Sequence, residues 1–167
     1  MPSNSENIAS FIALSKNSMV YQMEEENLSG AAKTVFNEFS AEAERKGLVY
    51  RLEIPQGIKD KVYVDYDRLQ EVIGNLLSNA VKYTIKGSVT VKLVQPNKKR
   101  VRVEIVDTGV GISKEEQKKL FQKFQRIETN VGKTTGTGLG LYISKLIVEK
   151  FNGSIGVESD VGRGSTF

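Results

Sequence analysis

Apolar residues recur at helical spacing along four stretches of this chain. Where they fall three or four positions apart, one face of a helix can be buried. The helices predicted in this way cover residues 6–26, 29–46, 67–83 and 139–151. The stripe is clearest in the third of them, where it comprises Leu69, Val72, Ile73, Leu76, Leu77 and Ala80. Gly47 predicts the end of the second helix, because glycine commonly follows the last helical residue.

Apolar and polar residues alternate in most of the remaining segments, which is the pattern of half-buried strands. The strands predicted from it cover residues 48–54, 62–64, 88–95, 100–106 and 154–158. Turns are predicted at Pro55-Gln-Gly57 and Pro96-Asn97, and a Ser113-Lys-Glu-Glu116 capping box predicts a short helix to about Lys123. This order of elements indicates an α+β fold, with helices covering a mostly antiparallel sheet.

Composition limits the chemistry that the chain can perform. Its 167 residues are enough for one domain with a core of its own. It contains no cysteine and no histidine, which excludes disulfides, thiolate or histidine metal sites and a Ser-His-Asp triad within it. It has no apolar run of about 18 residues and no basic start followed by an apolar stretch. We therefore expect a cytoplasmic segment with no direct membrane insertion, whether or not a longer parent protein is membrane-tethered.

The formal net charge is +4, and the basic excess lies beyond Gly47. A basic body suits an anionic partner such as nucleotide phosphate or nucleic acid, whereas a solvated lysine-rich face explains the charge equally well. The lysines are scattered, and the sequence shows no aromatic platform on which bases could stack. We therefore expect no nucleic-acid partner.

One group of chemically capable residues lies on the predicted 67–83 helix. Asn75, Asn79, Lys82 and Tyr83 fall within about a quarter of the helix circumference, beside the apolar stripe. Two amides, an ammonium and a phenol on one edge suit a cation, phosphates and an aromatic ring, since an amide oxygen can coordinate Mg²⁺. A polar helix flank that binds nothing is the alternative.

A carboxylate follows the predicted 100–106 strand, in the sequence Asp107-Thr-Gly109-Val-Gly111. With a period of two, Asp107 continues the apolar face that ends at Ile105, so it lies at the rim of an apolar layer. A carboxylate there needs a hydrogen-bond donor, and the exocyclic amine of adenine is one. A common Asp-Gly turn is the alternative.

Glycines open the last predicted helix, in the sequence Gly136-Thr137-Gly138-Leu139-Gly140. Such a segment at a helix N-terminus presents backbone N–H groups to phosphate. It follows a polar loop rather than a strand, which excludes a Rossmann fingerprint. Ile127 stands where a Walker loop ending at Gly132-Lys133-Thr134 needs its first glycine, which excludes that motif too.

Two phenylalanines precede the polar loop over residues 125–137. Phe121 and Phe124 are spaced to anchor a mobile segment, and Arg126 can reach phosphate with its planar guanidinium. A core pair of phenylalanines with a surface arginine explains the same residues.

Taken in order, these blocks closely resemble the catalytic, ATP-binding domain of sensor histidine kinases, in the superfamily of gyrase, the Hsp-type chaperones and MutL. Asn75-Leu-Leu-Ser-Asn79-Ala-Val-Lys82-Tyr83-Thr84 is similar to its N box and Asp107-Thr-Gly109-Val-Gly111-Ile112 to its first glycine box. Leu120-Phe-Gln-Lys-Phe124 is similar to its F box, and Gly136-Thr-Gly-Leu-Gly140-Leu to its second glycine box. The resemblance covers about residues 28–167, including a similar closing segment from Val157 to Phe167.

The resemblance implies ATP and Mg²⁺ as cofactors. Asn79 would ligate Mg²⁺ with the help of Asn75, while Lys82 and Arg126 would contact phosphates, and these four are the implied catalytic residues. The backbone of residues 137–140 would also meet the phosphates, and residues 127–135 would form the ATP lid. The implied adenine-binding residues are Tyr83, which would pack on the ring, Asp107, which would accept the amine, and Gly109, Gly111, Ile112 and Thr166, which would line the base site.

The resemblance also implies an architecture and partners. The fold would be the Bergerat α/β sandwich, a mixed sheet covered by three helices over residues 28–167. Residues 1–27 would be a helical segment, because Phe11-Ile-Ala-Leu-Ser-Lys looks like the end of the family's dimerising hairpin. The family normally continues along another strand beyond Phe167. The implied partners are the histidine-containing dimerisation domain of the parent kinase and the receiver domain of a response regulator.

This sequence differs in two ways that bear on mechanism, once from the whole kinase and once from the ATP-hydrolysing relatives. The phosphoacceptor histidine is absent, so this chain cannot phosphorylate itself in that way. ATP-hydrolysing relatives carry a glutamate where Asn75 stands, and a neutral amide cannot take a proton from water. We therefore expect slow hydrolysis, with phosphotransfer to a histidine supplied by another domain. A serine protein kinase of the anti-sigma type and a non-catalytic nucleotide-sensing scaffold remain alternatives.

Overall fold

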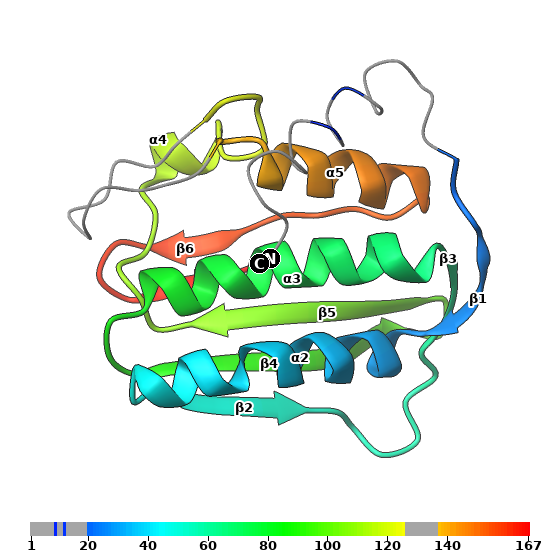
Figure 1. The fold of residues 1–167 in the computed structure, drawn as a ribbon, viewed down its shortest axis with the longest axis horizontal. Helices are drawn as coiled ribbons and strands as arrows, with labels where there is room; N and C mark the ends of the chain where they lie inside the picture. Colours follow the sequence, from blue (N-terminus) through cyan, green and yellow to red (C-terminus); the bar gives the residue numbers. More distant parts are fainter. Residues whose placement is uncertain (1–8, 10–11, 13–19, 126–136) are drawn as a thin grey trace.

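The computed structural model describes residues 9, 12, 20–125 and 137–167 of the chain. Its main sheet has five strands in the order β2-β4-β5-β7-β6 (Figure 1). These strands are β2 (Val49–Glu53), β4 (Ser88–Asn97), β5 (Arg100–Asp107), β6 (Glu158–Asp160) and β7 (Gly164–Thr166). β2 and β4 pair in parallel, and the other neighbours pair antiparallel. The predicted mixed, mostly antiparallel sheet is confirmed.

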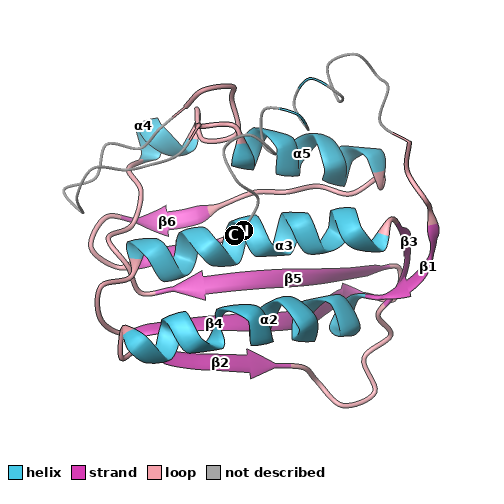
Figure 2. Cartoon of the chain, in the orientation of Figure 1, coloured by secondary structure: helices cyan, strands magenta, loops and turns pink. Residues whose placement is uncertain are grey.

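Three long helices lie side by side on one face of this sheet (Figure 2). They are α2 (Leu28–Arg45), α3 (Tyr66–Tyr83) and α5 (Gly140–Lys150), and the one-turn α4 (Lys114–Gln117) lies near β6. The arrangement is the predicted two-layer sandwich. Within the described ranges, no helix is both long and apolar enough to cross a membrane.

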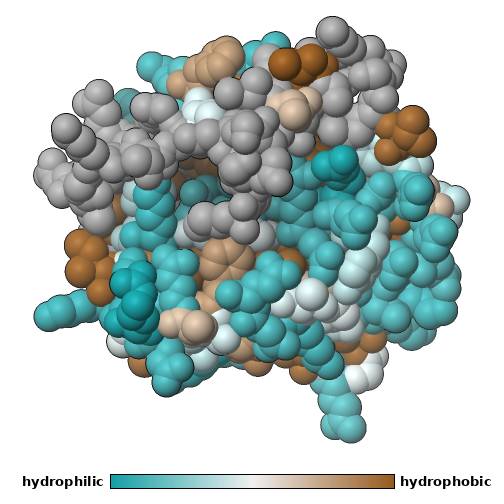
Figure 3. Space-filling view, in the orientation of Figure 1, coloured by the Kyte–Doolittle hydropathy of each residue, from teal (hydrophilic) through white to brown (hydrophobic). Residues whose placement is uncertain are grey.

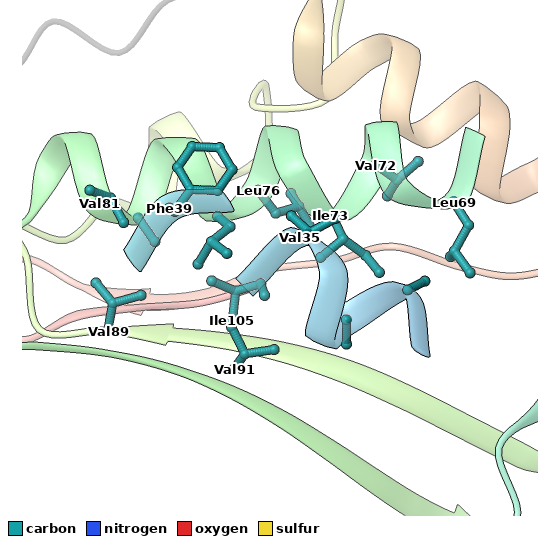
Figure 4. Close-up of a cluster of buried hydrophobic side chains, with 14 of the residues drawn as sticks. Val35, Phe39, Leu69, Val72, Ile73, Leu76, Val81, Val89, Val91 and Ile105 are labelled. Atoms are coloured by element: carbon teal, nitrogen blue, oxygen red, sulfur yellow. The ribbon is translucent and has the colours of Figure 1, made fainter. Parts of the chain in front are cut away.

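The core is an apolar layer between the helices and the sheet (Figure 4). The stripe predicted on the third helix faces the inward side chains of β4 and β5, and Leu77, Val91 and Ile105 are fully buried. The face shown in Figure 3 is mainly hydrophilic over α2 and α3, as expected for amphipathic helices.

A second, two-stranded sheet corrects the helix predicted over residues 6–26. Its strands are β1 (Glu24–Asn27) and β3 (Lys61–Val64), which pair antiparallel. The acidic run at Glu24 is therefore extended, because it finds a partner strand and an opposite charge: Glu25 Oε1 lies 2.5 Å from Lys61 Nζ. Ala9 and Ile12 have helical backbone, and the other residues before 20 lie outside the described ranges. The domain boundary at residue 27 stays a prediction.

The helix predicted to run to about Lys123 ends at Gln117. The capping box is present, with Ser113 and Glu116 bonded to each other's backbone N–H groups. Beyond it the backbone closes i→i+3 bonds, such as Gln122 N–H to Lys119 O at 2.9 Å, so the chain continues in tight turns.

Strand limits also differ from the prediction at two places. The turn between β4 and β5 lies at residues 98–99 rather than at Pro96-Asn97, and the Asn97 side chain caps it by accepting the Lys99 N–H at 2.9 Å. The strand predicted over residues 154–158 is instead β6, Glu158–Asp160, because β7 supplies partners only for these three residues.

Candidate active site

The polar edge predicted from helical spacing lies on α3. Asn75, Asn79, Lys82 and Tyr83 are each half-buried, while the neighbouring apolar stripe is buried. The side chain of Asp65 caps the start of the helix by accepting a first-turn N–H at 3.0 Å. The four groups therefore share one accessible edge along the second half of α3.

One end of this edge meets the beginning of α5. Asn75 Nδ2 donates to Ser144 Oγ at 2.9 Å. A Cβ at Gly140 would lie 2.5 Å from Asn75 Oδ1, so a larger residue there would displace the Asn75 amide. Leu139, the N-cap residue of α5, makes no side-chain hydrogen bond that would cap the helix. Backbone N–H groups of α5 thus lie beside an amide of α3, an arrangement that suits an anion.

The residues just before α5 follow the same side of the site. Thr137 is half-buried and its Oγ1 accepts the N–H of the buried Leu139 at 3.3 Å. A Cβ at Gly138 would lie 2.9 Å from Gln125 O, so the chain before residue 126 and the chain after 136 lie together. Arg126 and the segment predicted as a lid, residues 127–135, lie outside the described ranges.

The other end of the α3 edge meets the turn that follows β5. The Nζ atom of Lys82 lies 5.2 Å from the centre of the Tyr83 ring. A Cβ at Gly109 would lie 2.7 Å from Tyr83 O, so this glycine packs directly against the last turn of α3. Residues predicted from two separate motifs are therefore in contact here.

Asp107, the last residue of β5, is buried, as the alternation of the strand predicts. Its Oδ1 accepts the Gly109 N–H at 2.8 Å. Burial raises the pKa of this carboxyl above its usual range, and hydrogen bonds from the backbone of Gly109 and Ser165 offset part of that shift. A buried carboxylate of this kind favours a ligand that offers hydrogen-bond donors.

The remaining predicted base-site residues lie in the turn that follows Asp107 and on the neighbouring strand β7. Gly111 has a φ of +72°, and a Cβ on it would lie 2.0 Å from Asp160 O, so glycine is required on both counts. Ile112 is buried. Thr166 is half-buried on β7 and pairs with Val106, the residue before Asp107.

Ser159 on β6 organises this part of the site, and the sequence reasoning missed it. Its buried hydroxyl accepts the Ile112 N–H at 2.8 Å and donates to Gly164 O at 2.7 Å. Its carbonyl accepts the side chains of Lys114 and Gln117, each at 2.8 Å. Ser159 therefore ties the last hairpin to the turn after β5 and to α4, and its bonds to Ile112, Lys114 and Gln117 each span more than forty residues of sequence.

Any metal ion in this site would need some of its coordinating oxygens from the small molecule that binds there. The described part of the chain contains no group of three Asp, Glu, His or Cys side chains that could hold an ion. The amide oxygens of Asn75 and Asn79 are the neutral donors available on the α3 edge, and Mg²⁺ commonly combines one or two protein oxygens with phosphates and water.

A family model described as "Histidine kinase-, DNA gyrase B-, and HSP90-like ATPase" matches residues 64–167. This range is more than half of the chain and contains the site residues described above. The chain belongs to this ATPase family.

Named relatives of this ATPase domain are histidine kinases. The aerobic respiration control sensor protein ArcB of Escherichia coli K12 is 37% identical over 128 residues, which are 75% of this chain and 16% of ArcB. The crystal structure of full-length ShkA in complex with AMPPNP has a TM-score of 0.84 at 25% identity, and covers 96% of this chain and 33% of ShkA. The catalytic domain of the histidine kinase ThkA has a TM-score of 0.73 at 29% identity, with 87% of this chain and 92% of that domain covered. This ATPase domain therefore spans a small part of the full-length kinases that it matches.

Proposed function

We propose that this ATPase domain binds ATP with Mg²⁺ and transfers the γ-phosphoryl group to a histidine on a dimerisation domain outside this chain. The chain contains no histidine of its own. The observation that carries the proposal is the position of the α3 edge, which touches α5 at Asn75 and the Asp107 turn at Tyr83. These two contacts are about 12 Å apart along the helix, at 1.5 Å per residue.

The site has two functional ends in this proposal. The base end comprises Asp107, Gly109, Gly111, Ile112 and Thr166. The phosphate end comprises Asn75, Asn79, Lys82 and residues 137–140, and Tyr83 lies between them. The presence of AMPPNP, an adenine nucleotide, in the ShkA structure supports an adenine nucleotide as the ligand.

At the base end, Asp107 accepts a hydrogen bond from the exocyclic amine of adenine. The buried carboxylate accepts backbone N–H groups from Gly109 and Ser165, and its remaining lone pairs leave acceptor capacity for the ligand. Guanine presents a carbonyl oxygen at the corresponding position, so it would oppose one acceptor with another. Tyr83 packs on the ring.

At the phosphate end, Asn79 and Asn75 offer amide oxygens to Mg²⁺, which neutralises phosphate charge when bound. Lys82 contributes an ammonium, and the N–H groups at the start of α5 bind phosphate oxygens. Arg126 is proposed as a further phosphate contact from the segment that follows the F box.

This set of residues favours phosphotransfer over hydrolysis. Asn75 is engaged with Ser144 and has no basicity with which to activate water. Transfer requires mainly positioning and neutralisation of charge, because an incoming imidazole is already nucleophilic. The bond from the γ phosphorus to its bridging oxygen breaks, a bond to an imidazole nitrogen forms, and ADP leaves.

The test is transfer of label from γ-³²P-ATP to a histidine-containing dimerisation domain supplied in trans, followed by addition of a receiver domain. We expect acid-labile label on the histidine that passes to the receiver. Acid-stable label on serine would favour the serine-kinase alternative. ATP binding without transfer would favour a nucleotide-sensing scaffold, and fast release of phosphate to water would contradict the role of Asn75.

A further inference from the structure

The two long neighbouring helices α2 and α3 end in different ways. After α2, Gly47 adopts a φ of +66° and its N–H bonds to Glu44 O at 2.8 Å. The Leu48 N–H bonds to Ala43 O at 3.0 Å. These two bonds form a Schellman motif, so the chain that follows α2 satisfies its last carbonyls.

No such motif closes α3. Its C-cap, Thr84, is extended at φ −96° and ψ 109°, and its N–H bonds to Ala80 O at 3.1 Å. The last carbonyls of a helix have no N–H partner within the helix, so those of the final turn need donors from elsewhere. The residues of that turn include Lys82 and Tyr83, which the proposed function places on the nucleotide.

Lys46, the C-cap residue of α2, supplies those donors. Its Nζ donates to Val81 O and, at 3.1 Å, to Lys82 O. The side chain is half-buried, and burial lowers the pKa of its ammonium, with Glu42 opposing and Arg45 adding to the shift. An ammonium bonded to two successive carbonyls at the negative end of a helix is a favourable, charge-assisted contact.

The third carbonyl of the turn, Tyr83 O, lies against Gly109. The final turn of α3 is therefore contacted both by Lys46 and by the turn that follows Asp107. Fixing the peptide groups of Lys82 and Tyr83 fixes the points from which both side chains leave the helix.

We propose that Lys46 is a positioning residue of the nucleotide site, acting through the backbone of Lys82 and Tyr83. This inference rests on the proposed function, because it assigns Lys46 a part in nucleotide binding. A capping residue that serves stability alone would give a different result, since its loss would lower stability without a specific loss of affinity.

The test compares Lys46→Met and Lys46→Gln with Lys46→Arg, which keeps a charged group able to donate to both carbonyls. Tyr50→Phe is the matched control. It removes another long-range bond to α2, from Tyr50 Oη to Phe36 O at 3.0 Å, but does not touch α3. Thermal unfolding gives stability, and calorimetry gives affinity for ATP.

We expect Lys46→Met to weaken ATP binding about tenfold, Lys46→Gln to weaken it less, and Lys46→Arg to bind within about twofold of the wild type. Tyr50→Phe should lower the melting temperature while binding ATP like the wild type. Wild-type affinity in both Lys46→Met and Lys46→Gln would overturn the inference, as would an equal loss in Tyr50→Phe. A wild-type chain that binds no ATP would overturn the proposed function itself, and this inference with it.

Discussion

The base end and the phosphate end of the proposed site are built by different parts of the fold. At the base end, Asp107 closes a strand, and backbone hydrogen bonds and the Ser159 hydroxyl fix the turn that follows it. At the phosphate end, the functional groups are half-exposed side chains on a helix edge and N–H groups at a helix start. If the proposed function holds, the sheet sets the discrimination of the base, while the meeting of two helices sets the phosphate contacts.

The largest expected effect is at the base end, from Asp107→Asn. The amide replaces one acceptor oxygen by donors that oppose the adenine amine, so ATP affinity should fall about a hundredfold. Burial raises the pKa of Asp107, so its ionised form lowers stability at neutral pH relative to the neutral form. The variant should therefore fold as stably as the wild type at pH 7. Calorimetry with ATP and a melting curve check both points, and unchanged affinity would contradict the role of Asp107.

A backbone substitution tests how rigid the base end is. Gly111 and Gly57 share a φ of +72°, but a Cβ would lie 2.0 Å from Asp160 O at Gly111 and within 4 Å of nothing at Gly57. Gly57→Ala should cost about 1–2 kcal/mol for the left-handed backbone alone. Gly111→Ala should cost about 2 kcal/mol more, because backbone must move. Urea unfolding measures the free energy of unfolding of both variants. Equal losses of stability would show that the turn at Gly111 can accommodate a Cβ at no extra cost.

At the phosphate end, Lys82→Met should weaken ATP binding about tenfold while leaving adenosine binding nearly unchanged. The reason is that its ammonium contributes only to the charged part of the ligand. Lys86→Met, which removes an exposed charge just beyond α3, is the matched control and should have little effect. If both variants weaken ATP binding equally, general attraction to the basic surface explains the loss, not a contact from Lys82.

The smallest expected effect is a few-fold change with pH at the base end. In the proposed function the ionised form of Asp107 accepts the adenine amine, and burial raises the pKa of this carboxyl above its usual range. Affinity for adenosine should therefore fall as pH decreases toward that raised pKa, starting at a higher pH than an ordinary aspartate would give. Calorimetric titrations across the acidic range provide the measurement. Adenosine affinity of Asp107→Asn should lack this pH-dependent component. If affinity falls with pH in the same way in both proteins, a group other than Asp107 causes the dependence.

Much of this arrangement could be predicted from periodicity. The two-residue period of β5 places Asp107 on the buried face, and the helical period of α3 places Asn75 and Asn79 on one edge, because both features depend on local backbone geometry. The order of the elements predicted helices on a mostly antiparallel sheet, whereas the mixed sheet covered by three helices followed from the family resemblance.

Features that depend on distant partners could not be predicted in this way. Ser159 reaches Ile112 and Lys46 reaches Val81 across 47 and 35 positions, and neither distance leaves a periodic signal in the sequence. The acidic run at Glu24 is a strand only because β3 lies beside it. Local propensity contains no information about such pairings, which depend on tertiary structure.

The parallel pairing of β2 with β4 has a consequence for how the domain assembles. A parallel pair needs a crossover connection, and here that connection contains α3. Contacts of high sequence separation form slowly, because a long loop must close before they are made. We therefore expect β2 to join the sheet after α3 has packed and brought β4 into register, so substitutions in the apolar stripe of α3 are expected to slow folding itself.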